Sequence, residues 1–144
     1  SATGSQYYFC QGVYPYIWFN VNSNGKLEWY FMGNQQAAAD PITANTWYHV
    51  ALTRDDAGYC RCFVNGVQQG GASQNVNATV GSEPTFGAAP DVAGNTSNFV
   101  GWLDEWRITK GVARYVADFA VPTAPFPDPP AASLGKRIQN GLVA

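Results

Sequence analysis

Two acidic residues lie side by side between two tryptophans in the stretch GWLDEWRITKGVARY, which runs from Gly101 to Tyr115. A pair of carboxylates can hydrolyse a glycosidic bond when both face one cleft, about 5–5.5 Å apart in a retaining enzyme. Asp104 and Glu105 are adjacent, however, and a regular strand sends adjacent side chains to opposite faces. One strand therefore cannot build this pair, and we expect no catalytic residue in the chain.

The same two acids suggest a structural role instead. Leu103 and Trp106 are both large and apolar but differ in parity, so both can point inward only if a β-bulge forms at Asp104–Glu105. Such a bulge re-aims one carboxylate toward the core, where a buried charge needs a partner. The candidate partners are three arginines, Arg54, Arg107 and Arg114. We therefore expect a buried structural ion pair between Asp104 or Glu105 and an arginine.

Composition limits the class of protein that must position these residues. The chain has 144 residues, 15% of them aromatic and only 12% charged, and its net charge is −2. With eight Lys and Arg scattered along the sequence, no basic stripe is available to neutralise phosphates, so nucleic-acid binding is disfavoured. No apolar run is long enough to span a bilayer, and no signal peptide is visible. We expect no membrane segment.

Short strands separated by turns are predicted over most of the chain. The expected strands are 6–11, 14–22, 26–32, 46–54, 59–64, 67–69 and 98–109, with short candidates at 77–80 and 84–88. This pattern indicates an all-β, antiparallel β-sandwich over residues 1–117. Five prolines between Pro122 and Pro130 cannot lie in a ladder, so residues 118–144 are predicted to form a Pro-rich strap and tail.

The chain has three cysteines, Cys10, Cys60 and Cys62, and an odd count is a poor basis for a disulfide framework. Cys60 and Cys62 should point to one face of a strand, which does not suit a bond between them. The only histidine is His49, so a zinc site lacks ligands, and nothing in the pattern places His49 beside a thiol. We expect buried free thiols in a protein made in a reducing compartment.

Several motifs in order resemble those of a known family. They are NTWYHVALTRD (45–55), RCFVNGVQQG (61–70), PTFGA (84–88), FVGWLDEWRITKGVARY (99–115) and the proline-rich run that starts at Phe119. Over roughly residues 17–128 the chain is similar to the laminin-G-like, concanavalin-A-like jelly roll, in the variant common in bacteriophage tail and structural proteins. The resemblance implies two packed antiparallel sheets and a module that binds carbohydrate or protein, or that serves as a part of a larger assembly.

Two departures from that family lead to a further expectation. Trp106 stands where the family usually has an aliphatic residue, and the strands that usually precede a segment like YYFCQG are missing. Either the chain is a fragment or another polypeptide completes the sheets. We expect a second polypeptide to lie along the edge QYYFCQ (6–11), and the proline strap to reach a neighbour instead of folding back.

A sugar-binding site would use aromatic residues that lie outside the predicted core. Tyr14, Tyr16 and Trp102 are the candidate platforms for a sugar, although tryptophans in a small sandwich mostly fill the core. Calcium occurs in some laminin-G-like domains, and Asp55, Asp56 and Asp91 lie in predicted loops, but no dense run of oxygen ligands is present. We expect no cofactor, with calcium as the weaker alternative.

The sequence and the resemblance together favour a non-enzymatic structural and attachment module of a virion, made in the host cytoplasm. It would be a phage tail, fibre or capsid decoration, it would contact other virion subunits in an oligomeric assembly, and it would touch a host-surface glycan. The alternative is a carbohydrate-binding adhesin domain of a bacterial surface protein. An adhesin should be a monomer with a sugar in a loop cleft.

Overall fold

Eight β-strands form the framework of the part of the chain that the computed structural model describes, residues 5–11, 17–31, 34–74, 83–88 and 97–127. They are β1 (Gln6–Gln11), β2 (Ile17–Val21), β3 (Lys26–Phe31), β4 (Asn34–Pro41), β5 (Val50–Arg54), β6 (Tyr59–Val64), β7 (Val67–Gln74) and β8 (Pro84–Phe86). These residues contain no helix, and so none that is long and apolar enough to cross a membrane.

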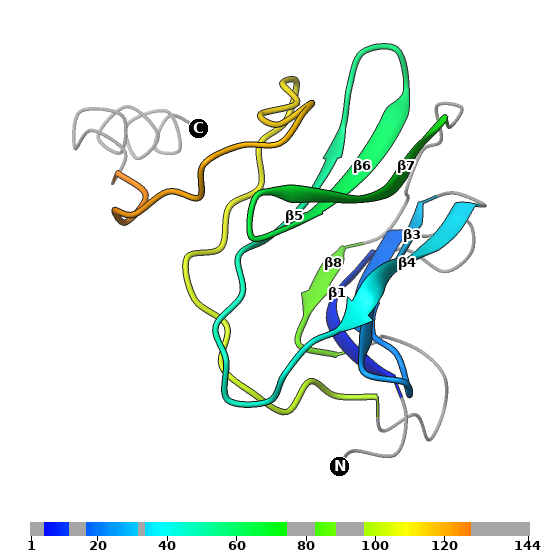
Figure 1. Cartoon of the computed structure of the whole chain (residues 1–144), viewed down its shortest axis with the longest axis vertical. Helices are drawn as coiled ribbons and strands as arrows, with labels where there is room; N and C mark the ends of the chain where they lie inside the picture. The colour runs from blue at the N-terminus through cyan, green and yellow to red at the C-terminus, as the bar shows by residue number, and fades with distance from the viewer. Residues whose placement is uncertain (1–4, 12–16, 32–33, 75–82, 89–96, 128–144) are drawn as a thin grey trace, which may run out of the picture.

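The strands form two antiparallel sheets that face one another (Figure 1). One sheet has five strands in the order β4-β3-β2-β1-β8, and the other has three in the order β5-β6-β7. The three-stranded sheet is the meander predicted from the sequence. An all-β antiparallel sandwich is therefore the fold of this chain, as the strand pattern predicted.

Tight turns set the register of the hairpins. Asn65 and Gly66 both have positive φ, with values of 50° and 81°. Two successive left-handed residues make a type I′ turn, whose twist matches that of the paired strands. Between β2 and β3, the Asn22 side chain accepts hydrogen bonds from the main-chain N–H groups of Asn24 and Lys26. These turns hold Val64 opposite Val67 and Val21 opposite Leu27.

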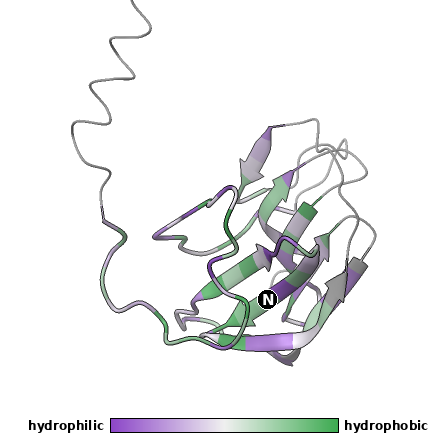
Figure 2. Cartoon of the chain, turned by 90° about the horizontal axis from the view of Figure 1, so that it is seen from above, coloured by the Kyte–Doolittle hydropathy of each residue, from purple (hydrophilic) through white to green (hydrophobic). Residues whose placement is uncertain are grey.

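The core lies between the two sheets. Phe19, Leu27 and Trp29 of the five-stranded sheet are buried there, and Cys62 contributes from the three-stranded sheet. Leu27 and Trp29 are each only 1% exposed, which confirms the face predicted from the alternation in strand 26–31. Strand bands of apolar and polar residues in Figure 2 follow the same alternation. Burying large side chains of this kind supplies most of the stabilising free energy of such a fold.

All three cysteines are free and buried, as expected. Burial raises the pKa of the Cys60 thiol to about 11, and it raises the pKa of the Cys62 thiol further. A thiol in such surroundings stays protonated at neutral pH, so these residues behave as small apolar side chains.

The outer face of the three-stranded sheet is covered by residues 115–121. The rings of Tyr115 and Phe119 stack 3.5 Å apart and pack against Phe63, which is completely buried. The main-chain N–H of Phe119 donates to the carbonyl of Gly66, and Asp118 accepts from the N–H of Gln68. The beginning of the strap thus folds back on its own sheet, contrary to the expectation that it would reach a neighbour. The domain boundary at 117/118 stays a prediction.

The strands differ from the prediction in four further ways. Strand β1 is an interior strand, paired with β2 on one side and with β8 on the other, so QYYFCQ is not an open edge. Strand β4 was not predicted, and β5 begins at Val50 instead of Thr46. Residues 98–109 have a strand sequence but join no ladder beyond a single bridge from Asn98 to Tyr7. The candidate strand at 77–80 lies outside the described residues.

Candidate functional site

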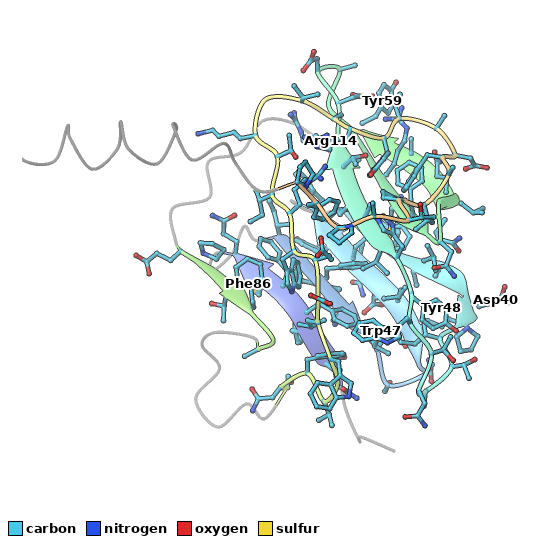
Figure 3. The ribbon with its side chains drawn as sticks, turned by 90° about the vertical axis from the view of Figure 1, so that its left-hand side faces the viewer. Asp40, Trp47, Tyr48, Tyr59, Phe86 and Arg114 are labelled. Carbon is cyan, nitrogen blue, oxygen red and sulfur yellow. The ribbon has the colours of Figure 1, made fainter. Side chains whose placement is uncertain are left out.

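Residues 97–116 run along one side of the sandwich, from the β8 end of the five-stranded sheet to the β5–β6 turn (Figure 1). Figure 3 faces this side, where the segment passes in front of the sheets and reaches Arg114 near Tyr59. Its start is held by main-chain hydrogen bonds from Phe99 to Gly87 (2.8 Å) and from Tyr7 to Ser97 (3.3 Å). We call this stretch, residues 97–116, the side segment.

The far end of the side segment is held as firmly as its start. The carbonyl of Tyr115 accepts a hydrogen bond of 2.8 Å from the Thr53 hydroxyl, and the Tyr115 ring packs on Phe63. Between the two anchors, the main-chain groups of residues 101–104 and 106–113 form no hydrogen bond with any other residue that the structure describes. The middle of the segment is therefore positioned by its ends and by a few side-chain contacts.

Apolar side chains on the side segment are unusually open to solvent. Among the described residues, seven of the eleven exposed large hydrophobic side chains belong to it: Val100, Trp102, Leu103, Trp106, Ile108, Val112 and Val116. Trp102 is 85% exposed, whereas the Trp106 ring meets Phe86 of β8 at 4.8 Å. A run of this kind is a marker of an interaction site, because scattered single residues are normal and a contiguous group is not.

The two acids of the side segment are both exposed, so the expectation of a buried acid is wrong. The Asp104 carboxylate accepts from the main-chain N–H of Glu105 at 2.8 Å, and the Glu105 carboxylate accepts from the N–H of Phe126 at 2.8 Å. Glu105 has a φ of 53°, so the chain does deviate at the predicted point. It makes an exposed bend there, because none of the strands that the structure describes pairs with it to form a bulge.

The arginines predicted to pair with these acids lie elsewhere. The Arg107 guanidinium sits 3.5 Å from the centre of the Phe126 ring, a cation–π contact. Arg114 donates to the Thr109 hydroxyl at 2.8 Å. Within the described part of the chain, neither Asp104 nor Glu105 forms an ion pair with an arginine. The recorded ion pair instead joins Arg61 to Asp55 at 2.7 Å.

Of the predicted sugar platforms, Trp102 is exposed on the side segment, and Tyr14 and Tyr16 lie outside the described residues. A second exposed tryptophan, Trp47, was not proposed from the sequence, although it is 67% exposed (Figure 3). The sequence predicts Trp47 as part of a strand at 46–54, whereas the strand begins at Val50 and leaves Trp47 outside it. Trp47 and Trp102 lie on different segments, and no contact between them is recorded.

The loop carboxylates considered for calcium border a shallow pocket of about 240 Å³ between the β5–β6 turn and residues 111–116. Asp55 and Asp56 line it, but the Asp55 carboxylate accepts from Arg61 and from the N–H of Tyr59. The hydrogen bond from Arg61 is the main reason why the pKa of Asp55 lies below its ordinary value. No group of three metal-ligating side chains occurs among the described residues, and Asp91 lies outside them. The Asp55 carboxylate is thus already engaged by Arg61 and Tyr59, and the calcium alternative stays a prediction.

Comparison with known proteins gives a family. No curated protein matches the chain. A solved structure, an S-layer domain-containing protein (residues 221–444) from Clostridium thermocellum ATCC 27405, is similar at 18% identity with a TM-score of 0.40, covering 83% of this chain. The chain spans 61% of the length of that structure. The sequence model of a laminin G family, described as the concanavalin A-like lectin/glucanases superfamily, matches residues 1–114. The chain therefore belongs to the concanavalin A-like lectin/glucanases superfamily.

Proposed function

We propose that this chain is a non-enzymatic structural and attachment module of a virion, which contacts neighbouring subunits of the particle. The observation that carries the proposal is the exposed apolar row on the side segment, with Trp102, Ile108 and Val112 each more than half exposed. A soluble monomer rarely leaves a contiguous group of this kind uncovered, since covering it removes apolar surface from water. A protein partner is therefore the natural ligand of this side.

Catalysis has less support than attachment. The superfamily name covers lectins and glucanases, so family membership leaves the choice to the residues. A glycosidase needs one carboxylic acid and one carboxylate that flank the scissile bond. Asp104 and Glu105 are neighbours in the chain, and each has a carboxylate oxygen engaged by a main-chain N–H. The two carboxylates therefore do not form the acid and base pair of a glycosidase.

The virion placement rests on the resemblance of the motifs from NTWYHVALTRD to the proline-rich run after Phe119. The exposed apolar side chains of the side segment are consistent with a subunit of a larger assembly. The test is to purify particles from the producing cells, cross-link them and identify the peptides joined to this chain. We expect side-segment peptides to be linked to other particle subunits. Absence of the chain from purified particles would reject the virion placement.

Trp102 and Trp47 favour a second candidate, a carbohydrate-binding adhesin domain, because an open indole face can stack on a sugar ring. Titration of a glycan panel, followed by tryptophan fluorescence, distinguishes the two. A monomeric chain that binds one glycan saturably, and that loses binding in Trp102→Ala, would establish the adhesin. The attachment module predicts no saturable glycan binding that depends on Trp102.

The prediction on catalysis uses the same preparation. We expect the purified chain to release no reducing ends from any glycan of the panel, and Asp104→Asn with Glu105→Gln to change nothing in that assay. Sustained release that is abolished in the double variant would overturn the non-enzymatic assignment. The single variant Asp40→Asn, at an exposed acid on β4, is the matched control for the loss of a surface charge.

A further inference from the structure

We propose that residues 101–110 are the surface on which a second copy of this chain docks, by antiparallel pairing of the two copies of this stretch about a two-fold axis. The inference rests on the proposed function, because it names the first neighbouring subunit that the attachment module contacts. It is carried by the open backbone of the stretch, its exposed apolar side chains and the order of its charges.

The open backbone is the first step. Residues 101–104 and 106–110 have the composition of a strand, with Trp102, Ile108 and Thr109 among them, yet their main-chain groups bond to no other residue in the described ranges. An extended stretch with unpaired N–H and C=O groups accepts another strand by β-augmentation. The two anchors of the side segment, at Phe99 and Tyr115, hold the stretch in place while leaving it uncovered.

Apolar exposure is the second step. Trp102 is 85% exposed and Ile108 is 65% exposed, and the stretch lies on the outside of the sandwich (Figure 3). Apolar and polar residues are mixed along the stretch, with Trp102 and Leu103 before the two acids and Ile108 before Thr109 and Lys110. Pairing would remove these side chains from water, which stabilises a complex in proportion to the apolar area buried.

The order of the charges selects a second copy as the occupant. Acids come first and bases follow, since Asp104 and Glu105 precede Arg107 and Lys110. A parallel in-register alignment would place acid against acid, whereas an antiparallel alignment can place Asp104 of each copy against Arg107 of the other. Opposite charges directly across a ladder are favourable and like charges are not. The stretch is thus complementary to itself, as a two-fold interface requires.

One register satisfies the charges and the bend together. If the axis passes between Glu105 and Trp106, Asp104 lies opposite Arg107 of the partner subunit and Leu103 lies opposite Ile108 of the partner subunit. The left-handed Glu105, with φ of 53°, then falls at the centre as a bulge, between two short paired stretches. A shift of one residue that brings Glu105 against its own copy sets like charges together and is disfavoured.

Arg107 is prepared for this contact. Its guanidinium carbon lies over the Phe126 ring, 3.5 Å from the ring centre, and this contact restricts the side chain before the partner arrives. A guanidinium bound through its face keeps the N–H donors on its edge for a carboxylate. Arg107 therefore offers an oriented fork to the Asp104 carboxylate, which is exposed.

The experiment measures the mass of the full chain by sedimentation equilibrium over a wide concentration range. We expect a reversible dimer, and we expect Asp104→Lys and Arg107→Glu each to raise its dissociation constant about tenfold or more. The double variant with both changes should return within about threefold of the unmodified chain, since the charges are then exchanged. Asp40→Lys, a charge reversal at an exposed acid on β4, is the control and should have no effect.

A second variant keeps the test independent of charge and folding effects. Leu103→Cys combined with Ile108→Cys should form a disulfide between copies under mild oxidation. Trp47→Cys, at an exposed site outside the docking surface, should not. A monomer at every concentration, or single charge variants that match Asp40→Lys, would overturn the two-fold docking. A chain that is monomeric yet cross-linked to other subunits in particles would reject this inference and keep the proposed function.

Discussion

Two acidic pairs in this chain look alike in sequence and differ in structure. Asp55 and Asp56 are followed by Arg61, and Asp104 and Glu105 are followed by Arg107. The first pair contains a real ion pair, with Asp55 and Arg61 at 2.7 Å and their side chains only 20% and 16% exposed. The second pair is exposed and bonds only to main-chain N–H groups nearby.

The ladder makes the difference. Asp55 opens the turn between β5 and β6, and that turn is closed by main-chain hydrogen bonds from Asp55 to Tyr59 and from Gly58 to Asp55. With Thr53 opposite Arg61, the arginine is brought back over the acid. Among the described residues, no strand pairs with the side segment to return Arg107 toward Asp104. Charges of opposite sign therefore pair where the backbone has already fixed their distance, and close spacing in sequence does not suffice.

The largest expected effect contrasts a covered residue of the meander with an open residue of the side segment. Phe63→Ala removes a completely buried ring beneath Tyr115 and Phe119, and should lower the free energy of unfolding by about 3–5 kcal/mol. Trp102→Ala, at an 85% exposed ring, should change it by less than about 0.5 kcal/mol. Urea unfolding at low protein concentration measures both, and equal losses would contradict the contrast.

An intermediate effect is expected where residues 115–121 meet the meander. Gly66 has a φ of 81°, and a Cβ there would collide with the carbonyl oxygen of Phe119. Gly66→Ala should therefore cost about 1–3 kcal/mol of unfolding free energy. Gly71→Ala, on β7 with open space around the added carbon, is the control and should cost much less. Similar losses in both variants would indicate that Phe119 is not docked over the turn.

The smallest effect concerns the two acidic pairs, and its size depends on pH. The hydrogen bond from Arg61 lowers the pKa of Asp55 below its ordinary value of 3.8, so the folded state favours the ionised form. Asp55 thus contributes stability that is full above that value and is lost as pH falls through the lowered pKa. Asp55→Ala should destabilise the chain near neutral pH, and the difference from the unmodified chain should shrink below about pH 4.

Asp104→Ala serves as the comparison for Asp55→Ala. Its acid is exposed and forms no ion pair within the described part of the chain, so its substitution should lower the free energy of unfolding near neutral pH by less than Asp55→Ala does. Unfolding free energies measured from neutral to acidic pH give both curves. A stronger dependence on pH at position 104 than at position 55 would show that the ladder does not decide which pair is structural.

Much of the fold was predictable because alternation and turn residues carry it. Strands β1, β3 and β6 match the predicted segments closely, and the Asn65-Gly66 turn was located from its two residues alone. Strand β4 was missed because its Gln and Ala residues have little preference for strands, and it becomes a strand by pairing with β3. At 98–109 a strand was predicted and none formed: the strand propensity is strong there, but beyond the single bridge at Asn98 none of the described strands pairs with these residues.

The site was less predictable than the fold. Sequence reasoning placed the important chemistry in the stretch around Asp104, and that stretch is indeed the most exposed apolar part of the described chain. It expected burial there, because a strand with Trp106 and Leu103 in it is normally covered in a sandwich. Whether a strand-like segment is covered depends on what lies beside it, and that information is tertiary. The ion pair at Asp55 was missed for the same reason.

The three buried thiols have a consequence for how long such a module could last outside a cell. Oxidation and alkylation both need an accessible thiolate, and burial withholds access while the raised pKa of Cys60 and Cys62 withholds the thiolate. While the fold stays closed, air and peroxide meet a surface without these sulfur atoms. The rate at which an added thiol-reactive reagent modifies the chain then reports how often the sandwich opens.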